Sequence, residues 1–367
     1  MATIKDVARR AGVGVATVSR VINQSGPVSA ATRQRVLTAI AELQFQPSRA
    51  ARHLATAQSG TIGVILPYLT RPFFVSVLRG IEALVAETDY NLHIFNIETR
   101  QKRDYYLTQA PFRGRVDGLL IVSLPLHEAH VARLGQLRIP TVLIDTHYPS
   151  LPSISVDNVA GGRLATEHLI ELGHRRIAYI AGPAEPELGF TVNLERRTGY
   201  LQALQVHGLP VRDEYMLLRG DGMTWGARMA EALLDLAEPP TAVVAASDEL
   251  AIGALQVARA RGLQVPEQLA IIGFDDIELA RFLGLSTVRQ PMDRMGRVAT
   301  ETLMRAMRLR QMPSPRALRL PLEVVVRETT RRNAAETQPV QAGHAPQLAG
   351  EDRHTVIIKR HTPAKES

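Results

Sequence analysis

The 367-residue chain contains no cysteine. This excludes disulfide bonds, thiolate nucleophiles and cysteine-based zinc sites, and it is compatible with a reducing cytoplasm. No stretch of the sequence is long and apolar enough to span a membrane, and the N-terminus leads into charged residues without the apolar region of a secretion signal. We therefore expect a cytoplasmic protein that does not bind membranes.

The motifs of common enzyme classes are missing as well. The pair Gly12 and Gly14 follows a predicted helix rather than a strand, so it is not a dinucleotide-binding loop, and neither a Walker sequence nor a nucleophile elbow occurs. His127 and His130 do not have the spacing of a zinc protease. We expect no catalytic residue, no cofactor and no metal. A nucleotide-dependent enzyme is an alternative that only fold analogy supports.

Short helices are predicted at the start of the chain. The apolar face of the first helix consists of residues at helical spacing, namely Ile4, Val7, Ala8 and Ala11. Thr3, with Asp6 three residues later, is typical of a capping box. Gly12 ends this helix.

A second helix follows almost at once. Its residues Val18, Val21 and Ile22 turn toward the first helix, and the pair has the pattern of a helix-turn-helix. The opposite face carries hydroxyl groups that can bond to phosphates, an apolar pair that can contact a thymine methyl group, and an arginine that can form bidentate hydrogen bonds with guanine. That face consists of Val15, Ala16, Ser19, Arg20 and Asn23. A short helical hairpin can also be a simple packing unit.

The residues that follow favour DNA binding. Ser29 can cap a third helix from Thr32 to Leu43, which completes an all-α head of residues 1–46. Residues 47–60 are a basic segment and linker, too brief to be helical alone in water, so we expect them to fold on a partner. Residues 1–57 hold eight Lys/Arg against two Asp/Glu, whereas residues 58–330 hold twenty-nine against thirty. A basic excess confined to the head is the footprint expected for phosphate contact.

Beyond residue 60 the pattern changes to strands that alternate with helices. Predicted strands include Thr61–Pro67, Gly118–Val122, Thr141–Ile144, Ile177–Ala181, Ala242–Ala245 and Ala270–Phe274. This order predicts an α/β core at residues 61–331, built as two similar lobes whose parallel sheets are covered on both faces. Residues 332–367 are rich in Gln, Ala, Pro and charge, so we expect a disordered tail. The tail has no leucine heptads that could join dimers.

From Thr3 to about Arg327 the chain resembles the lactose-repressor (LacI) family of bacterial transcription regulators. The motifs that carry the resemblance are Thr3–Ala8, Ala16–Asn23, Val28–Arg33, Val156–Asn158, His168–His174 and Ile272–Asp276. The resemblance implies a core like that of periplasmic binding proteins, crossed by the chain near 155–158, 286–289 and 321–324. The first lobe is then expected at about 61–156 and 288–321, and the second at about 157–287 and 322–331.

The resemblance also implies a function. A homodimer would bind a palindromic operator in double-stranded DNA, most often as a repressor, and would respond to a small-molecule effector between the lobes. Carried over by position, Val15, Ala16 and Arg20 face bases, whereas Thr17, Ser19 and Asn23 lie nearer phosphates. Within residues 47–60 the resemblance implies a hinge helix that grips the minor groove. In it, Arg49 is a further DNA contact, and Leu54 is the wedge that enters a base step and kinks the duplex.

Open parallel sheets bind ligands beyond the carboxyl ends of their strands. Asp145, Ser247 and Asp275 follow predicted strands, and family position favours Asp275 as a ligand contact. Arg196 stands where the family has an arginine that faces the effector, and its guanidinium suits hydroxyl groups or a carboxylate. Phe73 and Phe74 can form a stacking wall for a ring, with core packing as the alternative for one of them. Trp225 is left out, because its spacing is one residue short.

The class of effector stays open at this stage. Arg196, Asp145 and Asp275 together suit a sugar or sugar phosphate, whereas the two phenylalanines would also suit a purine or another non-sugar metabolite. A transport-type sugar receptor is a more distant alternative, because the basic head and the missing secretion signal count against it.

Overall fold

The computed structural model describes residues 2–22, 25–45, 59–110, 112, 114–183, 187–312 and 314–331. Three of the expected DNA contacts, Asn23, Arg49 and Leu54, lie outside these residues, as does the expected tail at 332–367. None of the described helices is long and apolar enough to cross a membrane.

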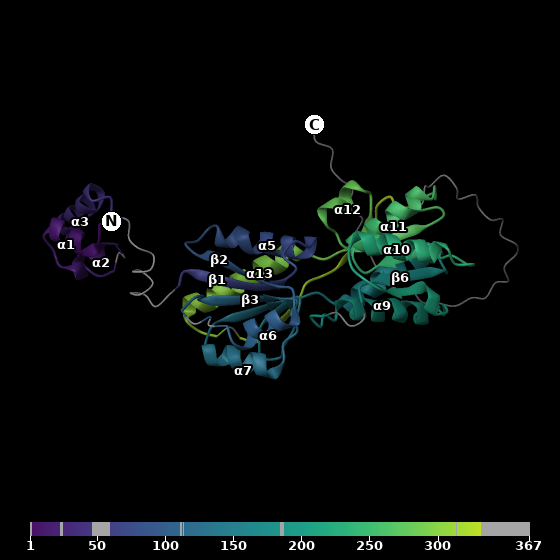
Figure 1. Cartoon of the computed structure of the whole chain (residues 1–367), viewed down its shortest axis with the longest axis horizontal. Coiled ribbons are helices and arrows are strands. Elements are labelled where there is room, and N and C mark those ends of the chain that lie inside the picture. Colours follow the sequence, from purple (N-terminus) through teal and green to yellow (C-terminus); the bar gives the residue numbers. More distant parts are fainter. Residues whose placement is uncertain are drawn as a thin grey trace, which may run out of the picture. The chain divides into compact units, whose positions relative to one another are not determined.

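The head contains three helices, α1 (Ile4–Ala11), α2 (Val15–Ile22) and α3 (Ala30–Glu42) (Figure 1). The predicted capping box is present, because the Thr3 N–H donates to the Asp6 carboxylate at 2.9 Å and the Asp6 N–H donates to Thr3 Oγ1 at 3.4 Å. The prediction of a helix-turn-helix head is confirmed. Helix α3 begins two residues earlier than expected, because Ser29 is the residue that caps it.

The first lobe is built on a six-stranded parallel sheet in the order β11-β5-β4-β3-β1-β2. Its strands are β1 (Thr61–Pro67), β2 (Asn91–Ile97), β3 (Gly118–Val122), β4 (Thr141–Ile144), β5 (Ser153–Ser155) and β11 (Ala317–Arg319). Its helices are α5 (Pro72–Val85), α6 (Arg100–Thr108), α7 (Glu128–Leu137) and α13 (Met292–Leu309). Neighbouring residues of β1 face opposite sides, because Val64 belongs to the apolar cluster that includes Val77 of α5, whereas Ile65 belongs to a separate cluster that includes Leu107 of α6. The sheet is therefore covered on both faces, as predicted.

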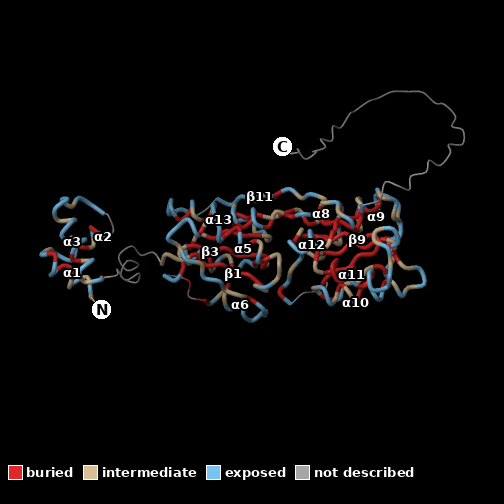
Figure 2. Tube along the Cα trace, turned by 90° about the horizontal axis from the view of Figure 1, so that it is seen from above, coloured by how far each residue is buried: buried red, intermediate tan, exposed pale blue. Residues whose placement is uncertain are grey.

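The second lobe repeats this plan with the strand order β12-β10-β9-β8-β6-β7. Its strands are β6 (Ile177–Ala181), β7 (Met216–Leu218), β8 (Ala242–Ala245), β9 (Ala270–Asp275), β10 (Ser286–Arg289) and β12 (Glu323–Val325). Its helices are α8 (Asn158–Glu171), α9 (Val192–Val206), α10 (Met223–Leu234), α11 (Asp248–Ala260), α12 (Glu278–Phe282) and the short 3₁₀ helix η1 (Asp213–Tyr215). The edge strand β12 runs antiparallel to β10, so this sheet is not wholly parallel. Figure 2 shows the buried residues concentrated along the strands of both lobes.

The chain passes between the lobes three times. It leaves the first sheet after β5, returns after β10, and leaves again after β11. The crossing expected near 286–289 follows directly after these residues, but the expected lobe boundary between 287 and 288 falls inside a strand. Those residues form β10, which is hydrogen-bonded to β9 and β12 in the second sheet, so the chain can leave that sheet only at Gln290 and Pro291.

Candidate effector pocket and DNA-contacting face

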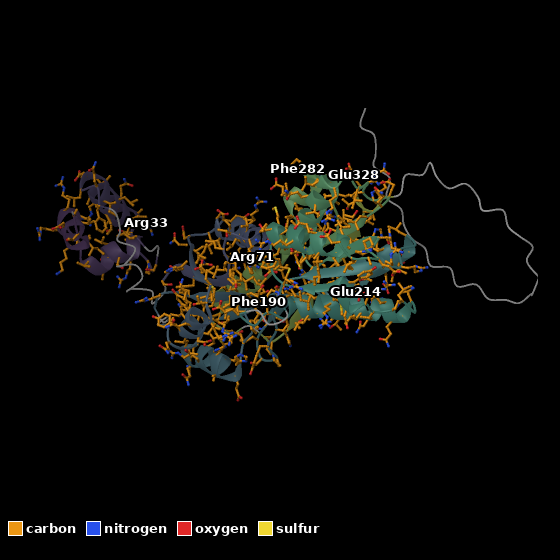
Figure 3. All side chains as sticks on the ribbon, turned by 45° about the vertical axis from the view of Figure 1, so that its right-hand side comes forward. Arg33, Arg71, Phe190, Glu214, Phe282 and Glu328 are labelled. Atoms are coloured by element: carbon orange, nitrogen blue, oxygen red, sulfur yellow. The ribbon has the colours of Figure 1, made fainter. Side chains whose placement is uncertain are left out.

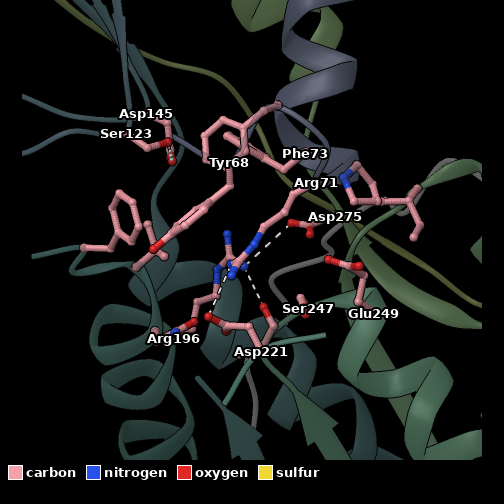
Figure 4. A pocket seen from close by; sticks show the side chains of 17 residues that line it. Tyr68, Arg71, Phe73, Ser123, Asp145, Arg196, Asp221, Ser247, Glu249 and Asp275 are labelled. Carbon is pink, nitrogen blue, oxygen red and sulfur yellow. Dashed lines mark hydrogen bonds and ion pairs between the residues drawn. The ribbon is translucent and has the colours of Figure 1, made fainter. Parts of the chain in front are cut away.

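A pocket lies between the two lobes, beyond the carboxyl ends of several strands (Figure 4). All six residues that the sequence nominated line this one pocket: Phe73, Phe74, Asp145, Arg196, Ser247 and Asp275. Asp145 directly follows β4, Asp275 is the last residue of β9, and Ser247 lies two residues beyond β8. The topology thus gathers side chains from both lobes, as the rule for parallel sheets predicts.

Arg196, on α9, is held on several sides before any ligand arrives. Its Nε donates to Asn158 Oδ1 at 2.9 Å and its Nη1 donates to the carbonyl of Ala246 at 2.6 Å. The guanidinium also lies 3.6 Å from the centroid of the Phe274 ring and 3.7 Å from a carboxylate oxygen of Asp275. A buried guanidinium with these partners is rigid, so it can present its remaining N–H groups to a ligand in a fixed direction.

Asp275 is buried at the end of β9 and has a positive φ of 117°. Its carboxylate accepts a hydrogen bond from Gln290 Nε2 at 2.5 Å. Burial raises the pKa of Asp275 to about 6, an effect that nearby Arg196 and the Gln290 hydrogen bond oppose. The positive φ turns the backbone sharply at the pocket mouth, and backbone strain of this kind is often found at functional sites.

Asp145 faces the pocket from the first lobe. Its carboxylate accepts a hydrogen bond from Ser123 Oγ at 2.7 Å, and its φ of 53° lies in the left-handed region. Burial raises the pKa of Asp145 to about 6, and the Ser123 hydrogen bond partly opposes this shift. The carboxyl groups of Asp145 and Asp275 therefore face the pocket from opposite lobes. This arrangement is suited to accepting hydrogen bonds from the hydroxyl groups of a ligand.

The other nominated residues have mixed roles. Phe74 is 7% exposed and belongs to the core beside α5, while Phe73 is half-buried and packs edge-on against it, with ring centroids 5.1 Å apart. Ser247 caps α11, because its hydroxyl accepts a hydrogen bond from the Leu250 N–H at 3.4 Å. Phe73 is therefore the better stacking surface of the two phenylalanines.

Two acidic neighbours of these residues are committed to the fold. Asp248 is fully buried and accepts hydrogen bonds from Thr287 Oγ1 at 2.6 Å and from the Ile277 N–H at 2.8 Å. Asp276 forms ion pairs with Arg289 and Arg327 at 2.7 and 2.6 Å. These carboxylates fix the loops after β8 and β9 and so hold Asp275 in place.

Several lining residues escaped the sequence analysis, namely Tyr68, Arg71, Ser123, Phe190, Asp221 and Glu249. Arg71 lies 4.2 Å from the Tyr68 ring centroid and pairs with Asp221 of the other lobe at 3.2 Å. Figure 3 labels Arg71 and Phe190 where the lobes meet. Tyr68 follows β1, so the strand-end rule could have found it, whereas Asp221 follows the three-residue strand β7, which the sequence did not predict. Trp225 is not among the lining residues.

The second helix of the head has one face in its core and one face open. Val18 and Val21 are buried against α1 and α3, whereas Val15, Ala16 and Arg20 are exposed. Thr17 and Ser19 are half-buried beside them. The described part of the nominated face thus has the surface that an α-helix needs to enter a major groove.

Comparisons with known proteins cover both parts of the chain. Residues 3–48 match the family described as bacterial regulatory proteins, lacI family, and residues 166–330 match a periplasmic binding protein-like domain. The HTH-type transcriptional repressor CytR of Escherichia coli (strain K12) is 37% identical over 336 residues, which cover 90% of this chain and 96% of that protein.

Two solved structures are similar over nearly the same length. The Lac repressor dimer bound to operator and the anti-inducer ONPF has a TM-score of 0.78 and 29% identity, and the match covers 90% of this chain and 99% of that one. The complex of the transcriptional regulator CelR with cellobiose has a TM-score of 0.64 and 31% identity, with coverage of 90% and 100%.

Proposed function

Because this chain belongs to the lacI family of bacterial regulatory proteins, and is therefore a DNA-binding transcriptional regulator, we propose that it is a dimeric cytoplasmic repressor of a palindromic operator. A hydroxyl-rich ligand in the pocket between its lobes sets the affinity for that operator. One observation carries the proposal. Arg196 and Asp275 of the second lobe face the same pocket as Asp145 of the first, so one ligand can bond to both lobes at once.

The charges around the pocket favour an uncharged sugar over a sugar phosphate. Among the described residues, four carboxylates line it, those of Asp145, Asp221, Glu249 and Asp275. Both lining arginines are already in ion pairs, Arg71 with Asp221 and Arg196 with Asp275. A phosphate group would therefore meet an excess of negative charge, whereas sugar hydroxyl groups would find acceptors. The bound cellobiose in the related CelR structure agrees with this class of ligand.

A panel experiment tests the proposal. Calorimetry of the full chain should detect binding of at least one neutral sugar from a panel that includes cellobiose, ribose, their phosphates and purines, and that sugar should change operator affinity measured by fluorescence anisotropy. Preference for a purine would assign the pocket to the other class of effector. Failure of every compound to bind would remove the proposed role of the pocket.

The head is tested separately. Arg20→Ala should weaken binding to a selected operator by about 1–3 kcal/mol and should change binding to random DNA little, because a bidentate contact to a base is specific. Fluorescence anisotropy with both DNA fragments measures the two affinities. An equal loss on both would reduce Arg20 to a phosphate contact.

A further inference from the structure

A short segment of the second lobe reaches into the core of the first. This segment, the strap (Glu187–Phe190), lies between β6 and α9 and precedes the helix that carries Arg196. Leu188 of the strap is fully buried, and its side chain belongs to the apolar cluster of the first lobe that includes Leu107 and Leu124. A leucine supplied by one lobe to the core of the other joins the two by burial of apolar surface.

The backbone of the strap is also bonded to the first lobe. Arg103 of α6 is 8% exposed, and its Nη1 donates a hydrogen bond to the Leu188 carbonyl at 3.2 Å. The Nε of Arg100 donates to the Glu187 carbonyl at 3.0 Å. Gly189 has a φ of 79°, and a Cβ there would lie 3.3 Å from Cγ of Pro125, so the strap fits closely against the first lobe.

The far end of the strap forms part of the pocket. Phe190 lines the cavity, and its ring lies edge-on to that of Tyr68, with centroids 6.0 Å apart. Tyr68 in turn lies under the Arg71 guanidinium. Leu188 itself does not line the pocket. Tyr68 and Phe190 thus form an aromatic pair with one ring from each lobe, and the geometry of this pair depends on where the strap is anchored.

We propose that the strap is a positioning element for the effector pocket: Leu188, seated in the core of the first lobe, holds Phe190 against Tyr68 and keeps the lobes together without contacting the ligand. The strap sets the affinity for the ligand, because a ligand that bonds to both lobes binds only those molecules in which the lobes stand close enough for both to reach it. The effect on ligand affinity rests on the proposed function, whereas the effect on the lobes does not.

The first test needs no ligand. Because the chain contains no cysteine, spin labels attach only to cysteines that are introduced. Spin labels on Gln136→Cys of α7 and Val206→Cys of α9, both exposed positions, report the distance between the lobes. In this labelled full chain, Leu188→Ala should broaden and lengthen the distance distribution measured by double electron–electron resonance. The matched control Leu107→Ala removes a leucine of the same cluster from the first lobe's own helix. It should lower the melting temperature while the distances stay unchanged.

The second test measures binding by calorimetry with cellobiose and ribose as probes. Leu188→Ala should weaken the affinity of whichever sugar binds by roughly ten- to hundredfold, the range that burial of one leucine side chain supports. Leu188→Met should bind nearly as the wild type does. If Leu188→Ala does not fold, Arg103→Gln, which shortens the side chain and removes the guanidinium that donates to the Leu188 carbonyl, should shift distances and affinity in the same direction.

The outcomes separate the two proposals. Unchanged distances in both Leu188→Ala and Arg103→Gln would overturn the role of the strap, whatever the sugars do. Equal lengthening in Leu107→Ala would also overturn it, because general loss of core stability would then explain the change. Altered distances in a protein that binds neither probe would support the strap and count against the sugar effector.

Discussion

The two lobes prepare their sides of the pocket differently. In the second lobe, Arg196 and Asp275 form an ion pair and are further bonded to Asn158, the Ala246 carbonyl and Gln290. In the first lobe, Asp145 accepts one hydrogen bond, from Ser123. The second lobe is therefore organised before a ligand arrives, which lowers the cost of binding, while the first lobe has a carboxylate whose remaining acceptor sites a ligand can fill.

The largest expected effect on sugar binding follows from removing Arg196 from the second lobe. Arg196→Ala should weaken sugar binding by about a hundredfold or more, because it removes the proposed ligand contact and also leaves Asp275 buried without its cation. The response of operator affinity to sugar should be lost with it, while operator binding without sugar should stay near the wild-type value. Calorimetry and fluorescence anisotropy on the same preparation measure both quantities.

A neighbouring residue provides the control. Arg197 is half-buried on the same helix but does not line the pocket, so Arg197→Ala should retain sugar binding. Similar losses in both variants would mean that the second lobe responds to any loss of an arginine from α9, and the assignment of Arg196 would be wrong.

A smaller effect is expected in the pH dependence of stability. Burial raises the pKa of Asp275 to about 6 from 3.8. Between these values the folded protein binds more protons than the unfolded chain, so this residue makes the free energy of unfolding fall as pH rises from about 4 to about 6, with little change above. Asp275→Asn should remove that contribution, so urea unfolding should show a variant that gains stability relative to the wild type across this window. A stability difference that is constant with pH would contradict the raised pKa.

The smallest effect is expected on the less organised side. Ser123→Ala removes the hydrogen bond from Ser123 Oγ to the Asp145 carboxylate and should weaken sugar binding by only about 0.5–1.5 kcal/mol, because ligand hydroxyl groups can take its place. Calorimetry measures the change. A loss as large as that of Arg196→Ala would show that the first lobe is organised as strictly as the second.

Much of the fold could be predicted from the sequence. The head helices are marked by Thr3, Gly12 and Ser29, and strand β1 (Thr61–Pro67) was predicted with its observed bounds, because caps, glycine turns and continuous apolar runs are local signals. Asp145, Ser247 and Asp275 were nominated because strand ends converge in an open parallel sheet, whereas Arg196 was nominated from its position in the family, and all three strand-end residues and Arg196 line the pocket.

The remaining features depend on contacts between distant parts of the chain. Strand β10 was divided between the lobes because only its pairing with β9 and β12 assigns it to the second sheet. Asp221 follows a strand too short to be recognised, and nothing local to Leu188 indicates that it enters the core of the other lobe. Asp275 lines the pocket, whereas Asp276 is paired with Arg289 and Arg327, which lie farther along the chain, so the sequence could not separate the two.

The central claim is that the pocket between the lobes controls the affinity of the head for DNA. The most direct measurement is a thermodynamic cycle: a palindromic fragment selected by the protein from random DNA is titrated with and without the sugar that binds, and the sugar is titrated with and without that DNA. The two affinities should change by the same factor, about 1–3 kcal/mol, because coupling between two sites is reciprocal. A sugar that binds the wild-type protein, and loses affinity in Arg196→Ala, yet leaves the affinity for the DNA unchanged would contradict the account.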